Sequence, residues 1–295
     1  QSTVAQGSYA LFDTAQSRKF ALIGTGTGDF ASTEADRFLG VLPEPSSPTP
    51  QGFDLRHHQP NDSSGFSASV FFDRSSNRYV LSIRGTESLS DVLEDVNRIG
   101  LQGFAGDQAV SLYRYYRRLT TPAGQPVQYS ASEIELLNSL RQGLPLRLHL
   151  ASPTVPLFRA ELARDLGFAP LTGSGSSVIP TGAPLVVTGH SLGGHLALLF
   201  GRLFPSVTEH VYTYNAPGIS LIGEGGLRWL GIGPIDAARV TNVAARMGSE
   251  TVSRIWSKPG ENIGVFTEAG SSLYQHSIVP LTDSLALYDA FATLS

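Results

Sequence analysis

Residues 185–200, LVVTGHSLGGHLALLF, constrain the fold of this chain more than any other stretch. The apolar run at 185–188 has the character of a strand buried on both faces, and residues 192–203 have the pattern of a helix. Between them lies the pentapeptide GHSLG at 189–193, which fits the pattern G-x-S-x-G. A strand, a tight turn at Ser191 and a helix, in that order, are typical of a nucleophilic serine on an α/β sheet.

The residues of this motif have the properties that such chemistry needs. Ser191 must lie on a strained turn to present its hydroxyl above the sheet, and glycines on either side let the strand and the helix approach closely. The backbone N–H of Leu192, at the start of the helix, then points to where negative charge develops on an attacked carbonyl oxygen. A chance glycine-rich turn is the alternative, and the strand, the helix and Gly194 argue against it.

Other segments alternate between strand and helix patterns. Strands are predicted at 67–73, 78–84, 211–215, 239–243 and 263–267, with a hairpin connection at 74–77. Helices are predicted at 90–97, 107–119, 130–141 and 280–291, the third of them starting with a capping box at Ser130 and Glu133. This alternation predicts an α/β fold, with a mostly parallel central sheet and helices on both faces. We expect one domain over residues 1–295, with a cap-like insertion at about 120–184.

Composition excludes several classes of protein. The chain has no cysteine, so disulfides, thiolate metal sites and a cysteine nucleophile are excluded. Its net charge of −4 provides no basic surface for nucleic acid. No apolar run approaches the ~18 residues of a transmembrane helix.

The end of the strand at 78–84 provides a second signal. It continues as Arg84-Gly85-Thr86-Glu87, upstream of the serine turn. An oxyanion hole needs a second donor from a loop beside the nucleophile, and the backbone N–H of Thr86 is predicted to supply it. Taken alone, the same residues read equally well as an ordinary turn at the end of a strand.

A serine nucleophile also needs a base, which in this class of fold follows it in the sequence. Only His195, His210 and His276 follow Ser191. His195 lies in the helix that begins at the serine turn, and His210 is expected just before a strand. His276 is expected in a loop between the last strand and the last helix, so we predict that it is the base. His190 is expected to pack beneath the site, and the pair at 57–58 is expected to be structural.

With these motifs the sequence resembles the class 3 lipase family. The family has a strand ending in Arg-Gly-Thr or Arg-Gly-Ser, then Gly-His-Ser-Leu-Gly-Gly, then a late histidine, and the resemblance covers about 65–292. Segments at 58–61, 65–68 and 276–288 are similar to a bacterial branch of secreted lipases and phospholipases. The resemblance implies a Ser-acid-His triad, ester substrates with acyl chains and a secreted bacterial protein. It implies Ser191 as nucleophile, Thr86 and Leu192 as oxyanion donors and His276 as base.

The triad acid departs from the family pattern. The family usually has an aspartate shortly after the strand corresponding to 239–243, but residues 243–250 read VAARMGSE. The carboxylates between the serine and the base are Glu209, Glu224, Asp236, Glu250, Glu261 and Glu268. Glu250 alone follows the first of the two last strands by a short loop, so it is the predicted acid. Glu268 stays an alternative because it is close to His276 in sequence.

These residues predict a serine carboxylic-ester hydrolase of the lipase or phospholipase A type, acting through an acyl-enzyme. A peptidase or an acyltransferase on the same fold stays open, as does an inactive binding protein. The mechanism requires no cofactor, and the sequence does not show whether a structural calcium ion binds. The expected partner is a lipid or other acyl ester, met at a lipid–water interface. The segments 99–105 and 144–168 are rich in apolar residues. One interpretation is that they form a lid or a wall that binds the acyl chain, and the alternative is that they form hydrophobic core beneath an insertion.

Overall fold

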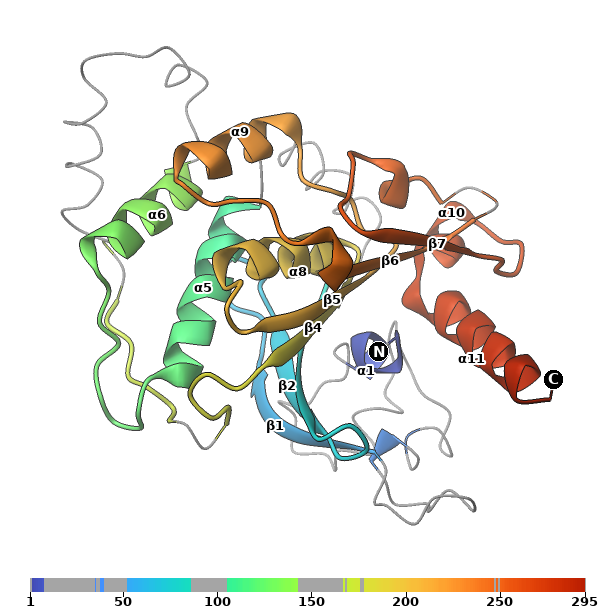
Figure 1. Ribbon diagram of the computed structural model, residues 1–295, viewed down its shortest axis with the longest axis horizontal. Coiled ribbons are helices and arrows are strands. Elements are labelled where there is room, and N and C mark those ends of the chain that lie inside the picture. Colours follow the sequence, from blue (N-terminus) through green and yellow to red (C-terminus); the bar gives the residue numbers. More distant parts are fainter. Residues whose placement is uncertain are drawn as a thin grey trace.

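The computed structural model describes residues 2–7, 35, 38–39, 52–85, 105–142, 167, 169–175, 178–246, 248 and 250–294. A seven-stranded sheet lies at its centre, with the strands in sequence order from one edge to the other (Figure 1). β1 to β3 pair antiparallel, and β3 to β7 pair parallel. The strands are β1 (Phe53–Gln59), β2 (Ala68–Asp73), β3 (Arg78–Ile83), β4 (Leu185–His190), β5 (Thr208–Tyr214), β6 (Val240–Ala245) and β7 (Glu261–Val265).

Six of the strands match predicted ones, and β1 was not predicted. Its sequence FDLRHHQ lacks a clear apolar pattern because it is an edge strand, with all its residues half-buried or exposed. The predicted hairpin connection at 74–77 is confirmed. It is held by the Asp73 carboxylate, which accepts hydrogen bonds from the N–H and hydroxyl of Ser75 at 2.9 and 2.6 Å.

Helices lie between and beyond the strands. The predicted helices at 107–119, 130–141, 192–203 and 280–291 correspond to α5, α6, α8 and α11, whereas the helix predicted at 90–97 lies outside the described residues. The capping box at the start of α6 is also confirmed, because the Ser130 N–H donates to Glu133 Oε2 at 2.8 Å. The described α-helices are α1 (Ser2–Gly7), α5 (Gly106–Thr120), α6 (Ala131–Gln142), α8 (Leu192–Leu203), α9 (Leu221–Trp229), α10 (Ser272–His276) and α11 (Ile278–Leu294).

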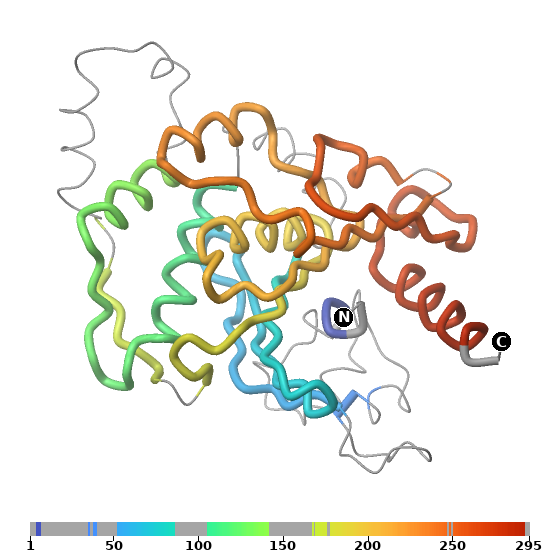
Figure 2. The backbone as a smooth tube through the Cα atoms, viewed as in Figure 1, coloured from blue at the N-terminus to red at the C-terminus, as the bar shows by residue number. Residues whose placement is uncertain are grey.

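Both faces of the sheet are covered by helices, as expected for strands that read as continuous apolar runs. In β4, Leu185 and Val187 belong to the main core with α5 and α8. Val186 belongs to a separate cluster that contains Val4 of α1. The first residues of α11 pack beside α1 on that second face, while its C-terminal part leads away from the sheet and is exposed (Figure 2). The chain therefore has the layers of an α/β hydrolase.

The predicted insertion at 120–184 is described only in part. Its α6 packs on α5, and Pro126 forms an isolated bridge with Thr172. Residues 143–166, 168 and 176–177 lie outside the described residues, as do residues 99–104 of the other apolar segment. The cap or lid therefore stays a prediction. No helix in the described ranges is long and apolar enough to cross a membrane.

The parallel strands bring distant parts of the chain to one edge of the sheet. The carboxyl ends of β4, β5 and β6 lie side by side, because His190 pairs with Tyr214 and Tyr214 pairs with Val243. The residues that follow these strands are consequently neighbours in space. Ligands of open α/β sheets bind at this edge.

Candidate active site

Ser191 lies in a sharp turn between β4 and α8. Its backbone angles are φ 55° and ψ −128°, a left-handed conformation that is strained for a residue with a Cβ atom. The turn closes only because its neighbours are glycines. A Cβ atom at Gly189 would lie 2.3 Å from the Gly193 backbone, and one at Gly193 would lie 2.2 Å from the Ile83 carbonyl oxygen. The serine turn therefore requires glycine at both positions.

Three predicted side chains meet at this turn. His276 Nε2 lies 2.8 Å from Ser191 Oγ, and His276 Nδ1 lies 3.1 Å from Glu250 Oε1. The Glu250 carboxylate accepts from Nδ1–H, so Nε2 is left to accept the serine hydroxyl proton. All three side chains are buried, with exposed fractions of 0% for Ser191, 4% for His276 and 1% for Glu250.

His276 is the last residue of the short helix α10, so the expectation of a loop was wrong at this position. The helix begins at a side-chain cap, because Ser271 Oγ accepts a hydrogen bond from the Tyr274 N–H at 3.2 Å. One turn of helix after β7 is too short to show an apolar periodicity in the sequence. It fixes the direction in which the His276 ring leaves the backbone.

Glu250 follows β6 by a short loop, as predicted, and its carboxylate has further donors. The Ser253 N–H points at both carboxylate oxygens, at 3.1 and 3.3 Å, and the Ser253 hydroxyl donates to Oε2. Burial raises the pKa of the Glu250 carboxyl, but the hydrogen bonds from His276 and Ser253 outweigh it, so that its pKa lies below the ordinary value. The carboxylate is therefore ionised at neutral pH.

The other carboxylates do not reach the base. Glu268 is exposed, and its Oε2 accepts a hydrogen bond from the Tyr274 hydroxyl at 3.3 Å. Glu261 is exposed at the start of β7. Glu209, Glu224 and Asp236 form ion pairs with Arg78, Arg202 and Arg239.

Asn215 supports the site, although its role was not predicted from the sequence. It directly follows β5 and is fully buried. Its Nδ2 donates to the backbone carbonyls of Gln275 and His276 at 3.1 and 2.9 Å, while its Oδ1 accepts from the Ala245 N–H at 2.9 Å. A polar residue at the carboxyl end of a predicted parallel strand is the signal that indicates such a role.

His190 lies beneath the site, as expected. Its Nε2–H donates to the His276 carbonyl oxygen at 2.6 Å, and the two rings are 5.0 Å apart at their centroids. Burial, and then the neighbouring His276, lower the pKa of His190 to about 3. His190 is therefore neutral, and it adds no positive charge beside His276.

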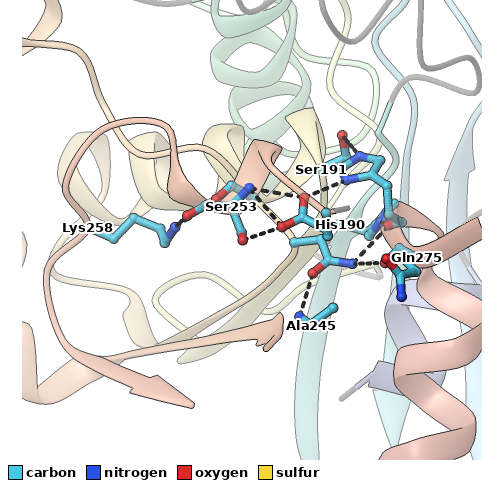
Figure 3. Close-up of polar contacts among 10 residues, drawn as sticks. His190, Ser191, Ala245, Ser253, Lys258 and Gln275 are labelled. Atoms are coloured by element: carbon cyan, nitrogen blue, oxygen red, sulfur yellow. Dashed lines mark hydrogen bonds and ion pairs between the residues drawn. The ribbon is translucent and has the colours of Figure 1, made fainter. Parts of the chain in front are cut away.

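Lys258 is a further residue that the sequence did not indicate. Its ammonium group donates to the backbone carbonyl of Ala216 at 2.9 Å and to that of Ser253. Figure 3 shows Lys258 on the opposite side of Ser253 from His190 and Gln275. Burial lowers the pKa of Lys258, and the Glu250 carboxylate acts in the opposite direction.

The predicted oxyanion donors are described only in part. Leu192 is the first residue of α8, where backbone N–H groups have no acceptor within the helix. Its N–H has no acceptor among the residues that the structure describes. Thr86 lies outside the described residues, although β3 ends at Ile83 beside the turn.

The remaining histidines have structural partners. His195 Nδ1 donates to the Gly218 carbonyl at 2.9 Å within α8, and His210 lies inside β5 rather than before it. His57 and His58 contact the hydroxyls of Tyr115 and Ser69 at 3.0 and 2.9 Å. Within the described ranges, no group of three or more His, Asp or Glu side chains is able to hold a metal ion.

A cavity of about 500 Å³ lies between α8, α9 and the segment at 256–259. None of Ser191, Glu250 or His276 lines it, whereas Lys258 does. The cavity is therefore separate from the reacting atoms and is no candidate for the ester site.

Comparisons with known proteins assign no role to the residues of this site. No protein-family model matches the chain. No curated protein matches it significantly. Among solved structures, the Lip2 lipase from Yarrowia lipolytica aligns over 90% of this chain and 78% of its own, with 15% identity and a TM-score of 0.40. A Rhizomucor miehei lipase in complex with its propeptide aligns over 95% and 76%, with 14% identity and a TM-score of 0.38. These values are too low to transfer a substrate or a residue's role.

Proposed function

We propose that this chain hydrolyses carboxylic esters through Ser191, His276 and Glu250, as an enzyme of the lipase or phospholipase A type. The proposal rests on the His276 ring, whose Nε2 is 2.8 Å from Ser191 Oγ while its Nδ1 is 3.1 Å from Glu250 Oε1. A base held between a hydroxyl and a carboxylate is the arrangement that activates a serine. The strained turn at Ser191 supports the same role.

In the proposed reaction, Ser191 Oγ attacks the ester carbonyl carbon while His276 Nε2 takes the hydroxyl proton. The carbonyl oxygen becomes an oxyanion that the Leu192 N–H stabilises, with Thr86 as the predicted second donor. His276 then gives the proton to the leaving alcohol, and the acyl group stays on Ser191. Water, deprotonated by His276, attacks the acyl-enzyme and releases the carboxylic acid.

The charges around the ring favour the protonated base that forms in each step. Glu250 is ionised and faces Nδ1, so it stabilises the imidazolium form of His276. His190 is neutral, because burial lowers its pKa to about 3. The negative charge of Glu250 thus faces the His276 ring, and His190 adds no positive charge that would oppose protonation of that ring.

The ester class is proposed from the resemblance to class 3 lipases in the Arg-Gly-Thr and Gly-His-Ser-Leu-Gly-Gly motifs. Triad geometry alone does not separate esters from amides. The secreted location and the bacterial branch stay predictions from that resemblance.

Substrate access requires a movement of the chain. The Ser191 side chain has an exposed fraction of 0%, so an ester reaches Oγ only after neighbouring atoms move aside. For a lid that opens on lipid, turnover of one ester should rise steeply as its concentration passes the critical micelle concentration. Smooth saturation, together with resistance of segments 99–105 and 144–168 to protease, would contradict the lid.

The proposed function is tested by a panel of acyl esters, phospholipids and peptides on the wild-type chain and on Ser191→Ala. We expect ester turnover in the wild type and its near-complete loss in the variant, with a residual acceleration of about 10³–10⁴ over water. A fluorophosphonate should label wild type once, at Ser191. The exposed Ser132→Ala on α6 is the matched control and should keep full turnover. Wild-type turnover in Ser191→Ala, or cleavage of peptides alone, would contradict the proposal.

A further inference from the structure

We propose that Lys258 is a positioning residue for the acid of the site, holding Ser253 where it orients the Glu250 carboxylate. The inference rests on the function proposed above, because it assigns Lys258 to that reaction. Three sets of contacts carry it: those between Glu250 and Ser253, those of the Lys258 ammonium group, and those that join the two loops on which these residues lie.

The Glu250 carboxylate is oriented from the side opposite the base. Ser253 donates its N–H to both carboxylate oxygens and its hydroxyl to Oε2, which leaves Oε1 directed at His276 Nδ1. Ser253 is buried and belongs to the short 3-10 turn η3 (Val252–Arg254). The direction of the carboxylate therefore depends on where this turn lies.

Lys258 holds that turn in place by a hydrogen bond to the backbone carbonyl of Ser253. The ammonium group donates to the Ser253 carbonyl oxygen (Figure 3). It also donates, at 2.9 Å, to the Ala216 carbonyl oxygen. Ser253 is consequently bound on both sides, with Lys258 at its carbonyl and Glu250 at its N–H and hydroxyl. Charge-assisted hydrogen bonds of this kind are shorter and stronger than neutral ones.

The two carbonyls belong to different loops, which pack closely. Ala216 follows β5, whereas Ser253 follows β6. The Gly218 N–H donates to the Ile255 carbonyl at 2.8 Å, and a Cβ atom at Gly218 would lie 2.3 Å from the Ser257 carbonyl oxygen. Lys258 thus binds the loop with the acid to the loop after β5, whose Asn215 binds the His276 backbone.

A cation suits this place better than an apolar residue of the same volume. Glu250 is an ionised carboxylate with an exposed fraction of 1%, and a buried charge is costly without partners. The Lys258 charge acts on Glu250 electrostatically, and its hydrogen bonds satisfy two backbone carbonyls. A methionine would fill the space but supply neither.

The test compares Lys258→Met, Lys258→Arg and the control Arg254→Met, which removes an exposed charge from the same turn. Turnover is measured per serine that a fluorophosphonate labels, so unfolded protein does not count. We expect Lys258→Met to lower kcat by about 10- to 100-fold with little change in KM, as for a misplaced catalytic group. Lys258→Arg should restore much of this loss, and Arg254→Met should keep wild-type kcat. An unchanged kcat in Lys258→Met, or an equal loss in Arg254→Met, would overturn the inference.

A double-mutant cycle shows whether Lys258 acts through Glu250. In the Glu250→Gln background, Lys258→Met should lower kcat by less than about threefold, because groups that act as a unit are not additive. A full further loss would overturn the inference. If Glu250→Gln itself kept wild-type turnover, the proposed function would fail instead, so the two failures are distinguishable.

Ser253→Ala keeps the test decisive if Lys258→Met does not fold. This variant removes the hydroxyl donor to Glu250 Oε2 and leaves the backbone contacts in place. We expect its kcat to fall by about 10-fold in the wild type and to change little in the Glu250→Gln background. A wild-type kcat in Ser253→Ala would contradict the orienting role on which the inference depends.

Discussion

The Asn215 side-chain amide donates a hydrogen bond to the backbone carbonyl oxygen of His276, with 2.9 Å between Nδ2 and that oxygen. His190 Nε2 donates to the same carbonyl at 2.6 Å. The backbone of the proposed base is therefore held by residues at the ends of β4 and β5, and not only by its own helix. The position of the ring depends on two strands that are distant from it in sequence.

We predict that Asn215→Asp lowers both stability and turnover. A carboxylate oxygen would replace the Nδ2 donor and face two carbonyl oxygens at hydrogen-bonding distance. Leaving such buried groups unpaired costs about 1–3 kcal/mol each. The control is Asn77→Asp in the exposed β2–β3 turn, which shares the positive φ. Urea unfolding and kcat check both variants, and equal behaviour of the two would contradict the role of Asn215.

Glu250→Gln should lower kcat by about 10⁴, as in other serine triads where an amide replaces the acid. Ser253 would keep the amide oxygen at the Oε2 position, which turns the amide NH₂ toward His276 Nδ1. The ring would then carry its proton on Nε2 and could not accept one from Ser191. Glu268→Gln, at an exposed carboxylate, is the matched control. Normal turnover in Glu250→Gln with a loss in Glu268→Gln would assign the acid to Glu268.

Ser191→Gly and Ser191→Ala should both be inactive but should differ in stability. Ser191 has φ 55° and ψ −128°, where alanine keeps the strain and glycine relieves it. The strain of about 1–3 kcal/mol exceeds the added chain entropy of glycine, so we expect Ser191→Gly to be about 1 kcal/mol more stable. Thermal unfolding of the two variants measures the difference. A less stable glycine variant would mean that the turn is unstrained.

Gly193→Ala should damage the site, whereas Gly233→Ala should not. A Cβ atom at Gly193 would lie 2.2 Å from the Ile83 carbonyl oxygen, and the clash would be with backbone rather than with the end of a flexible side chain. Overpacking of this kind costs about 1–3 kcal/mol or more. Nothing lies within 4 Å of the equivalent position at Gly233, so we expect a change within about 0.5 kcal/mol. Equal unfolding midpoints of the two variants would contradict the close packing at the serine turn.

Stability should fall as pH drops below 6.5, the ordinary pKa of histidine. Burial lowers the pKa of His190 to about 3 and that of His195 to about 4. The unfolded chain therefore binds these protons first, and the stability present above pH 6.5 is lost toward pH 4. Each histidine contributes about 1.4 kcal/mol per pH unit in this window. Because the pKa of Glu250 is lowered from its ordinary value of 4.5, protonation of this carboxylate adds a further loss of stability below about pH 4.5.

Urea unfolding at several pH values measures this dependence. His195→Asn keeps a donor toward the Gly218 carbonyl but does not titrate, so we expect it to lower the slope by about 1.4 kcal/mol per pH unit. A variant with the full wild-type slope would show that His195 is not the group that takes up the proton.

Local sequence by itself determined the serine turn and most of the elements around it. The helix at 192–203, the hairpin at 74–77 and the capping box at Ser130 were predicted and are present, because each depends on residues adjacent in the chain. Apolar runs likewise indicated six of the strands. The edge strand β1 and the helix α10 were missed, since neither has an apolar periodicity long enough to recognise.

The arrangement of the site was decided by tertiary structure alone. His276 and Ser191 are 85 residues apart, and topology placed both at one edge of the sheet without fixing the distance between their atoms. Sequence order favoured Glu250 over Glu268 but left both open, and the position of the η3 turn separates them, because only Glu250 is bound by Ser253 and faces the ring. The contacts of Asn215 and Lys258 join loops that follow different strands. Hydrogen bonds of that kind leave no pattern in sequence, since they depend on where the sheet brings the ends of its strands together.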